Sequence, residues 1–398
     1  LRSLPSTLSP QVWTTIGTGY PPERHGMWDF AATPDQLKTG FLWHALLAEK
    51  RSVGLCGWYF TWPPPPALGP RDFVIPSALA PAGDTHPSDY SFFWQIWTQE
   101  RPGEGGRAGL VKAGWEAFRH GVRMSTLRQA AGEVLVRKLR PRSEFDEDWR
   151  KRMLSAALQA DISVELLRTR RPEFAALLFT QIDRLCHKYW KFMEPEGFVD
   201  VTPEDRQRYG RVIEEGYAEI DRILGRLLAT LAPNADVIVV SDHGFQASHS
   251  GAAGSWCSVK AENLMQALGE SERVFATSIA DEVVLRPLAT GAAGDSLLVS
   301  LQQRLEAARV TGDPSPLFKA DRHGETLMLA LAPRDAIPER ASIALAGREY
   351  PFEELVYAGQ GAQWSGEHLP DGIFVLSGPA AARAAPADSL NVLDVAPT

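Results

Sequence analysis

The stretch between residues 174 and 240 constrains the fold most, because two short apolar runs flank a long amphipathic segment. The runs cover residues 174–179 and 236–240, residues 372–376 form a third, and residues 52–59 form a weaker fourth. Continuous apolar runs of this length are typical of strands buried on both faces of a parallel sheet. A strand, a helix and a second strand predict a crossover unit, in which ligands bind beyond the carboxyl ends of the strands.

The segment between the first two runs has the signals of a helix. Thr202 can cap its N-terminus, and Pro203 suits the first turn. Apolar residues then recur at helical spacing up to Leu231, and Pro233 ends the pattern. We therefore predict one long helix between the two strands.

The composition excludes several classes of protein. The chain has 398 residues, of which 44% are hydrophobic and 23% are charged, as in ordinary globular proteins. Its net charge of −8 includes no long block of one sign, so we expect no nucleic-acid partner. No apolar run reaches the roughly 18 residues of a membrane span. The three cysteines lack the spacing of a zinc site, and a cytoplasmic location is the default expectation.

Asp183 and His187 lie four residues apart just after the first apolar run. On a helix both side chains would project from one face, where they can bind one metal ion. The alternative is an exposed surface pair, which this spacing alone does not exclude.

Asp242 and His243 follow the second run directly, within Ser241-Asp242-His243-Gly244. A buried carboxylate is costly unless a cation or hydrogen bonds compensate its lost hydration. This position therefore favours a pair of metal ligands over the alternative, a hydrogen-bonded turn. His368 precedes the last predicted strand, and taken singly it is typical of an exposed loop.

The N-terminal segment predicts a helix that begins near Ser9. Pro10 suits its first turn, and Gly17 and Gly19 favour a turn at its end. Such a helix would present its N-terminus to an anion.

These segments together resemble the alkaline phosphatase superfamily, in its type I phosphodiesterase/nucleotide pyrophosphatase branch with its bacterial phosphohydrolase members. The resemblance is carried by residues 5–27, 181–190, 241–245 and 368–374. It implies an α/β fold, a three-layer alkaline-phosphatase-like sandwich with a largely parallel central sheet and inserted cap segments.

The resemblance also implies roles for individual residues. Ser9 aligns with the family's nucleophile, although a shift of the backbone would nominate Thr7 or Thr14 instead. Two divalent metal ions are implied, with Zn²⁺ expected and Mn²⁺ as the alternative. One metal site would comprise Asp183, His187 and His368, and the other Asp242 and His243.

The family supplies a further Asp from a strand before the nucleophile segment, and this sequence has no residue there. We therefore expect the N-terminal strand and helix of the core to be missing, and a targeting segment could precede Leu1. The expected core covers residues 1–260, with an inserted segment at about 60–165. An insertion or cap covers residues 261–362, and residues 363–398 return to the core.

The activity implied by the resemblance is metal-dependent hydrolysis of a phosphodiester, pyrophosphate or phosphomonoester through a phosphoseryl intermediate. The substrate would be a small phosphate ester. Two alternatives stay open: a non-catalytic binding protein, favoured by the missing Asp, and a phosphotransferase or mutase that uses the same intermediate. A sulfatase is disfavoured because Ser9 lacks a Cys-x-Pro-x-Arg-like context. The sequence does not indicate an oligomeric state.

Other polar and aromatic residues have structural interpretations. His25 is expected to form a turn, and His249 could reach the site only through a flexible loop. An aromatic group in the region outside the resemblance is expected in the core, with a leaving-group pocket as the alternative. This group comprises Trp58, Trp62, Phe92, Phe93, Trp94 and Trp97.

Overall fold

The computed structural model describes residues 1–30, 32–93, 114–139, 142–248, 255–279, 282–324, 326–332, 341–360, 364–381 and 389–396. The chain divides into two compact units. The first unit contains Leu1–Tyr189, Arg211–Phe245 and His368–Thr398, and the second contains Trp190–Gly210 and Gln246–Glu367. All six residues predicted to form the site therefore lie in the first unit.

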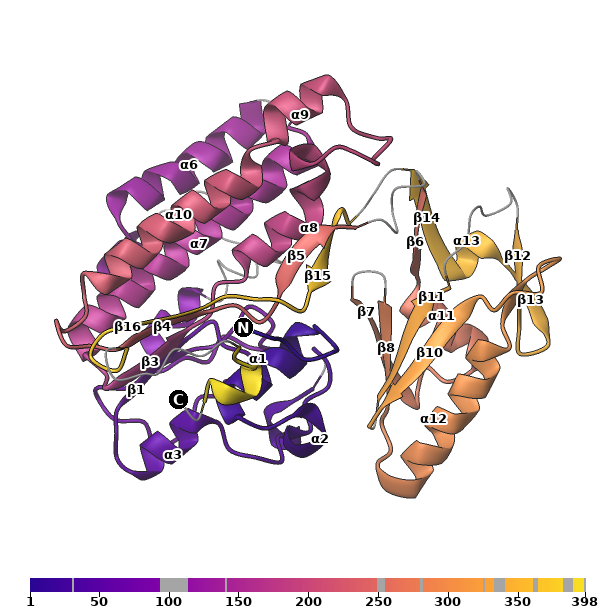
Figure 1. The fold of residues 1–398 in the computed structure, drawn as a ribbon, viewed down its shortest axis with the longest axis horizontal. Coiled ribbons are helices and arrows are strands. Elements are labelled where there is room, and N and C mark those ends of the chain that lie inside the picture. The colour runs from indigo at the N-terminus through magenta and orange to yellow at the C-terminus, as the bar shows by residue number, and fades with distance from the viewer. Residues whose placement is uncertain are drawn as a thin grey trace. The chain divides into compact units, whose positions relative to one another are not determined.

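Helices and strands are interspersed along the first unit, as expected of an α/β fold (Figure 1). Three of its elements, α8, β5 and β15, continue into the second unit. In chain order the elements, with η for a 3-10 helix, are α1 (Ser9–Thr18), α2 (Pro22–His25), η1 (Pro34–Gln36), α3 (Leu42–Ala48), β1 (Val53–Cys56), β2 (Phe73–Ile75), η2 (Ser88–Tyr90), α6 (Met124–Leu139), α7 (Glu144–Arg170), β3 (Phe174–Leu177), α8 (Gln181–Met193), α10 (Val212–Leu228), β4 (Val237–Val240), β5 (Gly244–Ala247), β15 (Gly366–Leu369), β16 (Phe374–Ser377) and η3 (Val392–Asp394).

A parallel sheet of three strands, in the order β2-β1-β3, organises the first unit. Leu55 of β1 lies opposite Val74 of β2 and Ala176 of β3. The strands predicted within residues 52–59 and 174–179 are thus confirmed. Strand β2 was not predicted, because its three residues are too few to give an apolar pattern.

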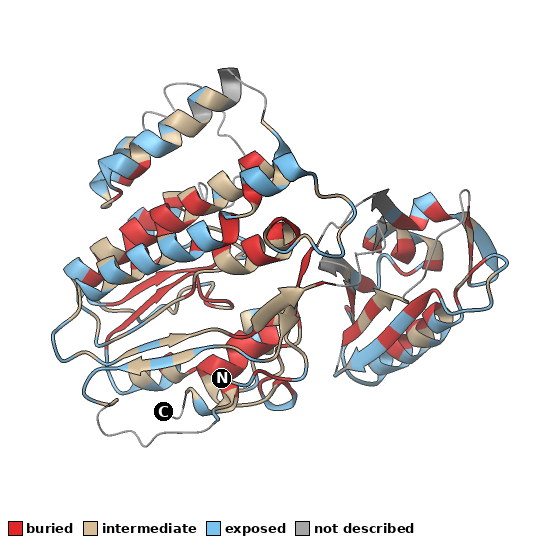
Figure 2. Ribbon diagram, turned by 45° about the horizontal axis from the view of Figure 1, so that its top comes forward, coloured by how far each residue is buried: buried red, intermediate tan, exposed pale blue. Residues whose placement is uncertain are grey.

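Helices cover both faces of this sheet, because alternate side chains of each strand point to opposite faces. Val53 and Leu55 pack in one cluster with α1 and α3. Cys56 and Ile75 pack in another cluster, on the other face, with α7. Figure 2 shows buried residues, in red, along these strands and along α7. The α/β class expected from the sequence is confirmed.

The third predicted strand is present as β16, but its expected parallel direction is wrong. It pairs with β4 in antiparallel register, with Val375 opposite Val239. The next strand in the chain after β4, β5, pairs with β15, which precedes β16. The chain runs in one direction along β4 and β5 and in the opposite direction along β15 and β16. Strands β4 and β16 are therefore antiparallel. These strands are also less buried than expected, since Ile238 is 40% and Val375 is 52% exposed.

The single long helix predicted after Thr202 is instead two helices, α9 (Pro203–Tyr209) and α10. The predicted N-cap is confirmed, because the Thr202 hydroxyl accepts a hydrogen bond from the backbone N–H of Asp205. The break falls at Gly210, where an added Cβ would lie 2.6 Å from the Arg206 carbonyl oxygen. It coincides with the boundary between the two units.

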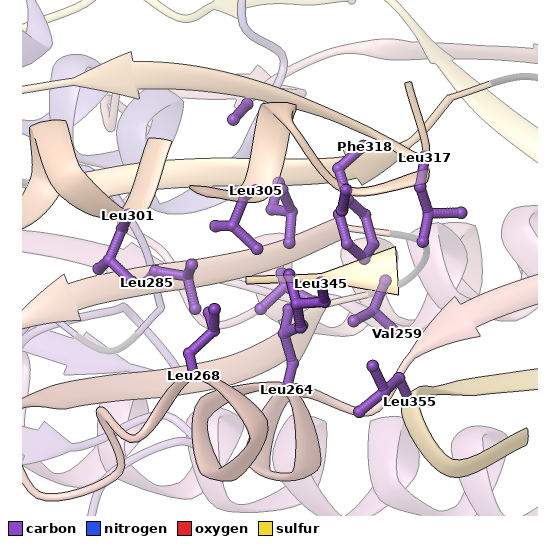
Figure 3. Close-up of a cluster of buried hydrophobic side chains, with 14 of the residues drawn as sticks. Val259, Leu264, Leu268, Leu285, Leu301, Leu305, Leu317, Phe318, Leu345 and Leu355 are labelled. Atoms are coloured by element: carbon purple, nitrogen blue, oxygen red, sulfur yellow. The ribbon is translucent and has the colours of Figure 1, made fainter. Parts of the chain in front are cut away.

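The second unit is built around a four-stranded antiparallel sheet in the order β10-β11-β8-β7. Leu264 of α11 and Leu301 and Leu305 of α12 lie in one apolar core with Leu285 of β8 (Figure 3). The predicted cap, residues 261–362, falls inside this unit, and its role as a cap stays a prediction. The remaining elements of this unit are β6 (Ser255–Val259), α11 (Ala261–Leu268), β7 (Val274–Ile279), β8 (Glu282–Pro287), α12 (Gly291–Glu306), β9 (Arg309–Val310), β10 (Phe318–His323), β11 (Thr326–Leu331), β12 (Ser342–Leu345), β13 (Arg348–Pro351), α13 (Phe352–Leu355) and β14 (Val356–Gln360).

Across the described residues of both units, no helix is long and apolar enough to cross a membrane.

Candidate metal centre and nucleophile

The five predicted metal ligands come from three places in the first unit. Asp183 and His187 lie one helical turn apart on α8, which follows β3. Asp242 and His243 occupy the short connection between β4 and β5, and His368 lies in β15. The C-terminal ends of β3 and β4 therefore both lead into the site, as expected from the two apolar runs of the sequence.

Nitrogen atoms of three imidazoles surround one carboxylate oxygen, Asp183 Oδ1. His368 Nε2 lies 3.4 Å from it, His187 Nε2 lies 3.5 Å from it and His243 Nε2 lies 3.7 Å from it. The Nε2 atoms of His187 and His368 are 2.9 Å apart. Zinc ligands at about 2.0–2.1 Å from the ion lie roughly 3.3 Å apart in a tetrahedral site, so these separations suit shared coordination.

Asp242 extends the cluster on the side of His243. Its Oδ2 atom lies 3.3 Å from His243 Nε2. Asp242 is 8% exposed and His243 is 5% exposed, so both are largely removed from water. The structure thus brings all five predicted ligands together, while their division between two ions stays a prediction.

Backbone carbonyls orient two of the imidazoles. The Nδ1–H of His243 donates to the Gly244 carbonyl at 3.1 Å, and the Nδ1–H of His368 donates to the Thr7 carbonyl at 3.1 Å. Since a carbonyl oxygen can only accept, Nδ1 carries the proton in both rings. The unprotonated Nε2 atoms then face the cluster, as in metal sites whose ligands are held by outer hydrogen bonds.

Three buried atoms of this cluster have no hydrogen-bond partner among the described residues: Asp183 Oδ1, Asp242 Oδ2 and His243 Nε2. Leaving such atoms unsatisfied is costly, and two neighbouring carboxylates add repulsion. A divalent cation bound by these atoms would remove both costs. The oxygen and imidazole donors fit Zn²⁺, and oxygen donors also suit Mn²⁺.

The electrostatics of the cluster agree with this interpretation. Burial raises the pKa of Asp242 to about 7, the charge of Asp183 adds to the effect, and the Ser9 hydroxyl opposes it. Burial, followed by the charge of His368, lowers the pKa of His243 to about 4. Burial also opposes ionisation of Asp183, but the three imidazoles outweigh it and hold its pKa below the usual range. His243 is therefore neutral at pH 7, the form that binds metals.

Ser9 lies at the start of α1, and the predicted helix is confirmed. It is 8% exposed, and its hydroxyl faces the Asp242 carboxylate closely enough to lower the pKa of that group. Thr14, one of the alternatives, instead donates its hydroxyl to the Pro10 carbonyl within the helix at 2.7 Å. Thr7, the other alternative, contributes its carbonyl oxygen to His368.

Sequence reasoning missed Phe245, two residues after His243. Its ring centroid lies 4.9 Å from that of His187, 5.3 Å from that of His243 and 5.0 Å from that of His368. The ring of Phe245 therefore packs against three candidate ligands at steep angles. Its position two residues after His243 is the sequence signal that could have identified it as part of the site.

Two of the residues with structural interpretations, His25 and Trp58, lie in the packing of the first unit. His25 is buried, its Nε2 lies 3.2 Å from the Thr15 hydroxyl, and its Nδ1 accepts from the Met27 N–H. Trp58 packs edge-on against Trp13, with ring centroids 5.2 Å apart. His249, Trp94 and Trp97 lie outside the described residues.

A family profile matches the greater part of the sequence. The profile of the type I phosphodiesterase/nucleotide pyrophosphatase family matches residues 1–289, which is more than half of the chain. This range includes Ser9 and every candidate ligand except His368. No curated protein matches the chain significantly. With the site assembled from the residues that carried the resemblance, the match shows that the chain belongs to the type I phosphodiesterase/nucleotide pyrophosphatase family.

Proposed function

We propose that this protein is a metal-dependent phosphoesterase that hydrolyses a phosphodiester, pyrophosphate or phosphomonoester through a phosphoseryl intermediate at a two-metal site. The observation that carries the proposal is the cluster of partnerless carboxylate and imidazole atoms beside the Ser9 hydroxyl. Family membership supports phosphoester hydrolysis in general.

The candidate ligands would form two groups, each of which binds one ion. When bound, divalent ions would act as Lewis acids that stabilise negative charge on phosphoryl, entering and leaving oxygens. The Nδ1 hydrogen bonds of His243 and His368 keep the ligand nitrogens in place before an ion arrives. One group would be Asp183, His187 and His368, and the other Asp242 and His243.

Ser9 is the nucleophile in this proposal. Its oxygen forms a bond to phosphorus while the bond from phosphorus to the leaving oxygen breaks, and the serine proton moves toward Asp242. Water then attacks the phosphoserine, which releases the phosphate product and restores the hydroxyl. The N-terminus of α1 favours the negative charge on the phosphoryl group through its free backbone N–H groups and its dipole. No acidic residue in its first turn opposes this effect.

The test is hydrolysis of bis-p-nitrophenyl phosphate and p-nitrophenyl phosphate by protein stripped of metal and reloaded with Zn²⁺ or Mn²⁺. Turnover is expected only with metal, and Ser9→Ala is expected to reduce it by about 1,000-fold or more. Thr14→Ala and Thr7→Ala are the matched controls, and both are expected to stay active because neither hydroxyl is used. The better substrate separates a diesterase from a monoesterase.

Two results would overturn parts of this proposal. No turnover of either ester with both metals loaded would refute hydrolysis of simple phosphate esters. Full activity of Ser9→Ala, with activity lost in Thr7→Ala or Thr14→Ala, would move the nucleophile to that threonine.

A further inference from the structure

The side-chain amide of Gln159, on α7, joins the end of β3 to the start of α8. Its Nε2 donates to the Leu178 carbonyl at 2.7 Å, and its Oε1 accepts from Gln181 Nε2 at 3.4 Å. Leu178 follows the last residue of β3, and Gln181 is the first residue of α8. One side chain thus bridges the connection between the strand and the helix that carries Asp183 and His187.

This bridge lies in the core of the first unit, where both glutamines are buried. The backbone N–H of Leu178 also donates to the Cys56 carbonyl of β1 at 2.9 Å, so the sheet and α7 hold Leu178 from two sides. Burying an amide is costly, and Gln181 Oε1 has no partner among the described residues. Packing alone would favour apolar side chains here. Hydrogen bonds, unlike apolar contacts, fix direction as well as distance, so the two amides indicate a role in positioning.

Helix α7 also holds α8 beyond the candidate ligands. The Tyr189 hydroxyl donates to the Phe145 carbonyl and accepts from the Trp149 N–H, in the first turns of α7. Tyr189 is buried and lies two residues after His187. Buried hydrogen bonds to α7 therefore fix α8 on both sides of its two candidate ligands.

The geometry of the metal centre leaves little room for α8 to move. Asp183 Oδ1 lies 3.4 Å, 3.5 Å and 3.7 Å from three imidazole nitrogens. Only one of these rings, His187, shares α8 with Asp183, whereas His243 and His368 come from other elements. Distances between a metal and its ligands vary by only about 0.2 Å. A shift of α8 by more than this would therefore separate its ligands from the other two.

We propose that Gln159 is a positioning residue for the metal centre, which fixes the start of α8 so that Asp183 and His187 meet the other ligands. This inference rests on the proposed function, because it takes these residues to bind metal. Gln159 acts through the backbone of residues 178–181 and does not itself bind the ion.

The test is metal binding by the purified protein in the absence of substrate. The visible absorption of bound Co²⁺ reports the geometry of its ligands, and titration against a coloured chelator gives the zinc affinity. Gln159→Leu, which is similar in size and removes both hydrogen bonds, is expected to lower the zinc affinity about 10-fold and to change the Co²⁺ spectrum. Gln181→Met breaks only the bond to Gln159, so a loss of about 3-fold is expected.

Ile162→Ala is the matched control, because it separates positioning from a general loss of stability. Ile162 is a buried residue of α7, and its apolar cluster includes no described residue of α8. The cavity left by the variant is expected to destabilise the metal-free protein at least as much as Gln159→Leu does, which denaturant unfolding measures. The zinc affinity of Ile162→Ala is expected to stay within about twofold of the wild type, with the same Co²⁺ spectrum.

The outcomes separate this inference from the proposed function. Unchanged zinc affinity and an unchanged Co²⁺ spectrum in Gln159→Leu overturn the inference, even if the enzyme hydrolyses esters. An equal loss of zinc affinity in Ile162→Ala also overturns it, because lost stability then explains the effect. Changes confined to the two glutamine variants support it, even where the metal-loaded wild type turns over neither ester.

Two further results are decisive. Where Gln159→Leu does not fold, Gln181→Met decides alone, with the same readouts. A wild type that binds neither Zn²⁺ nor Co²⁺ overturns the inference and the proposed function together.

Discussion

The Nδ1–H of His368 donates a hydrogen bond to the backbone carbonyl of Thr7, which lies 361 positions earlier in the chain. This contact fastens β15 to the segment that carries Ser9. One imidazole thus links a candidate metal ligand to the residue that would attack phosphorus. Displacing His368 should therefore disturb both metal binding and the placement of the nucleophile.

His368→Ala is expected to lower zinc affinity by about 100-fold and to abolish ester hydrolysis, because a ligand and its outer hydrogen bond are lost together. In the wild type, adding a chelator should lower the unfolding temperature, since a ligand that binds only the folded state stabilises it. The chelator should have little effect on the variant. His44→Ala, at an exposed position, is the control, and equal zinc content in wild type and His368→Ala would contradict this role.

Phe245→Leu is expected to lower zinc affinity by about 10-fold while the fold persists, because leucine cannot reproduce the packing of a ring against three imidazoles. Zinc titration and thermal unfolding of the metal-free protein separate the two effects. Phe275→Leu, in β7 of the second unit, is the matched control. A variant that binds zinc like the wild type would show that the ring only fills space.

Gly244→Ala is expected to destabilise the protein by about 1–3 kcal/mol, because its Cβ would lie 2.3 Å from the Asp371 carbonyl oxygen. The backbone of one strand has to move, and Asp242 and His243 move with it. Gly225→Ala is the control: it lies within α10 with nothing within 4 Å of its Cβ, so a gain of about 0.4–1 kcal/mol is expected. Denaturant unfolding measures both, and equal stability of the two variants would refute the close approach.

Protonation of His25 is expected to destabilise the fold in mild acid. Burial lowers the pKa of His25 to about 4, against 6.5 for the free side chain, so the unfolded chain binds the proton more readily. The stabilisation is complete above pH 6.5 and is lost as the pH falls toward 4, by about 3 kcal/mol in total. Denaturant unfolding of metal-free wild type and His25→Gln, from pH 7 to 4, measures this. As the pH falls, the wild type should lose more unfolding free energy than His25→Gln. A difference between the two proteins that stays constant over this pH range would exclude the effect.

The sequence predicts best those residues whose presence at their position is hard to explain by core packing. A short apolar run that ends in Asp242 and His243 places a carboxylate and an imidazole at a strand end, and the structure joins them to the other ligands. The α1 helix is predictable for a similar reason, since Pro10 and the following glycines act through local backbone preferences.

Other features depend on partners that are distant in the chain. The direction of β16 is not encoded in its apolar residues, because the pairing of β5 with β15 determines it. Gly210 interrupts a helical pattern that periodicity alone extends from Thr202 to Leu231. Phe245 resembles an ordinary core aromatic until the fold places three imidazoles around it.

The β4–β5 and β15–β16 ribbon also determines how this protein can change during evolution. The chain leaves the first unit just after Phe245 and re-enters it at His368. Residues 248–365 are thus an insertion between β5, which follows Asp242 and His243, and β15, which carries His368. Recombination that exchanges this insertion for another keeps all five ligands and Ser9, so the inserted part can diversify independently of the chemistry.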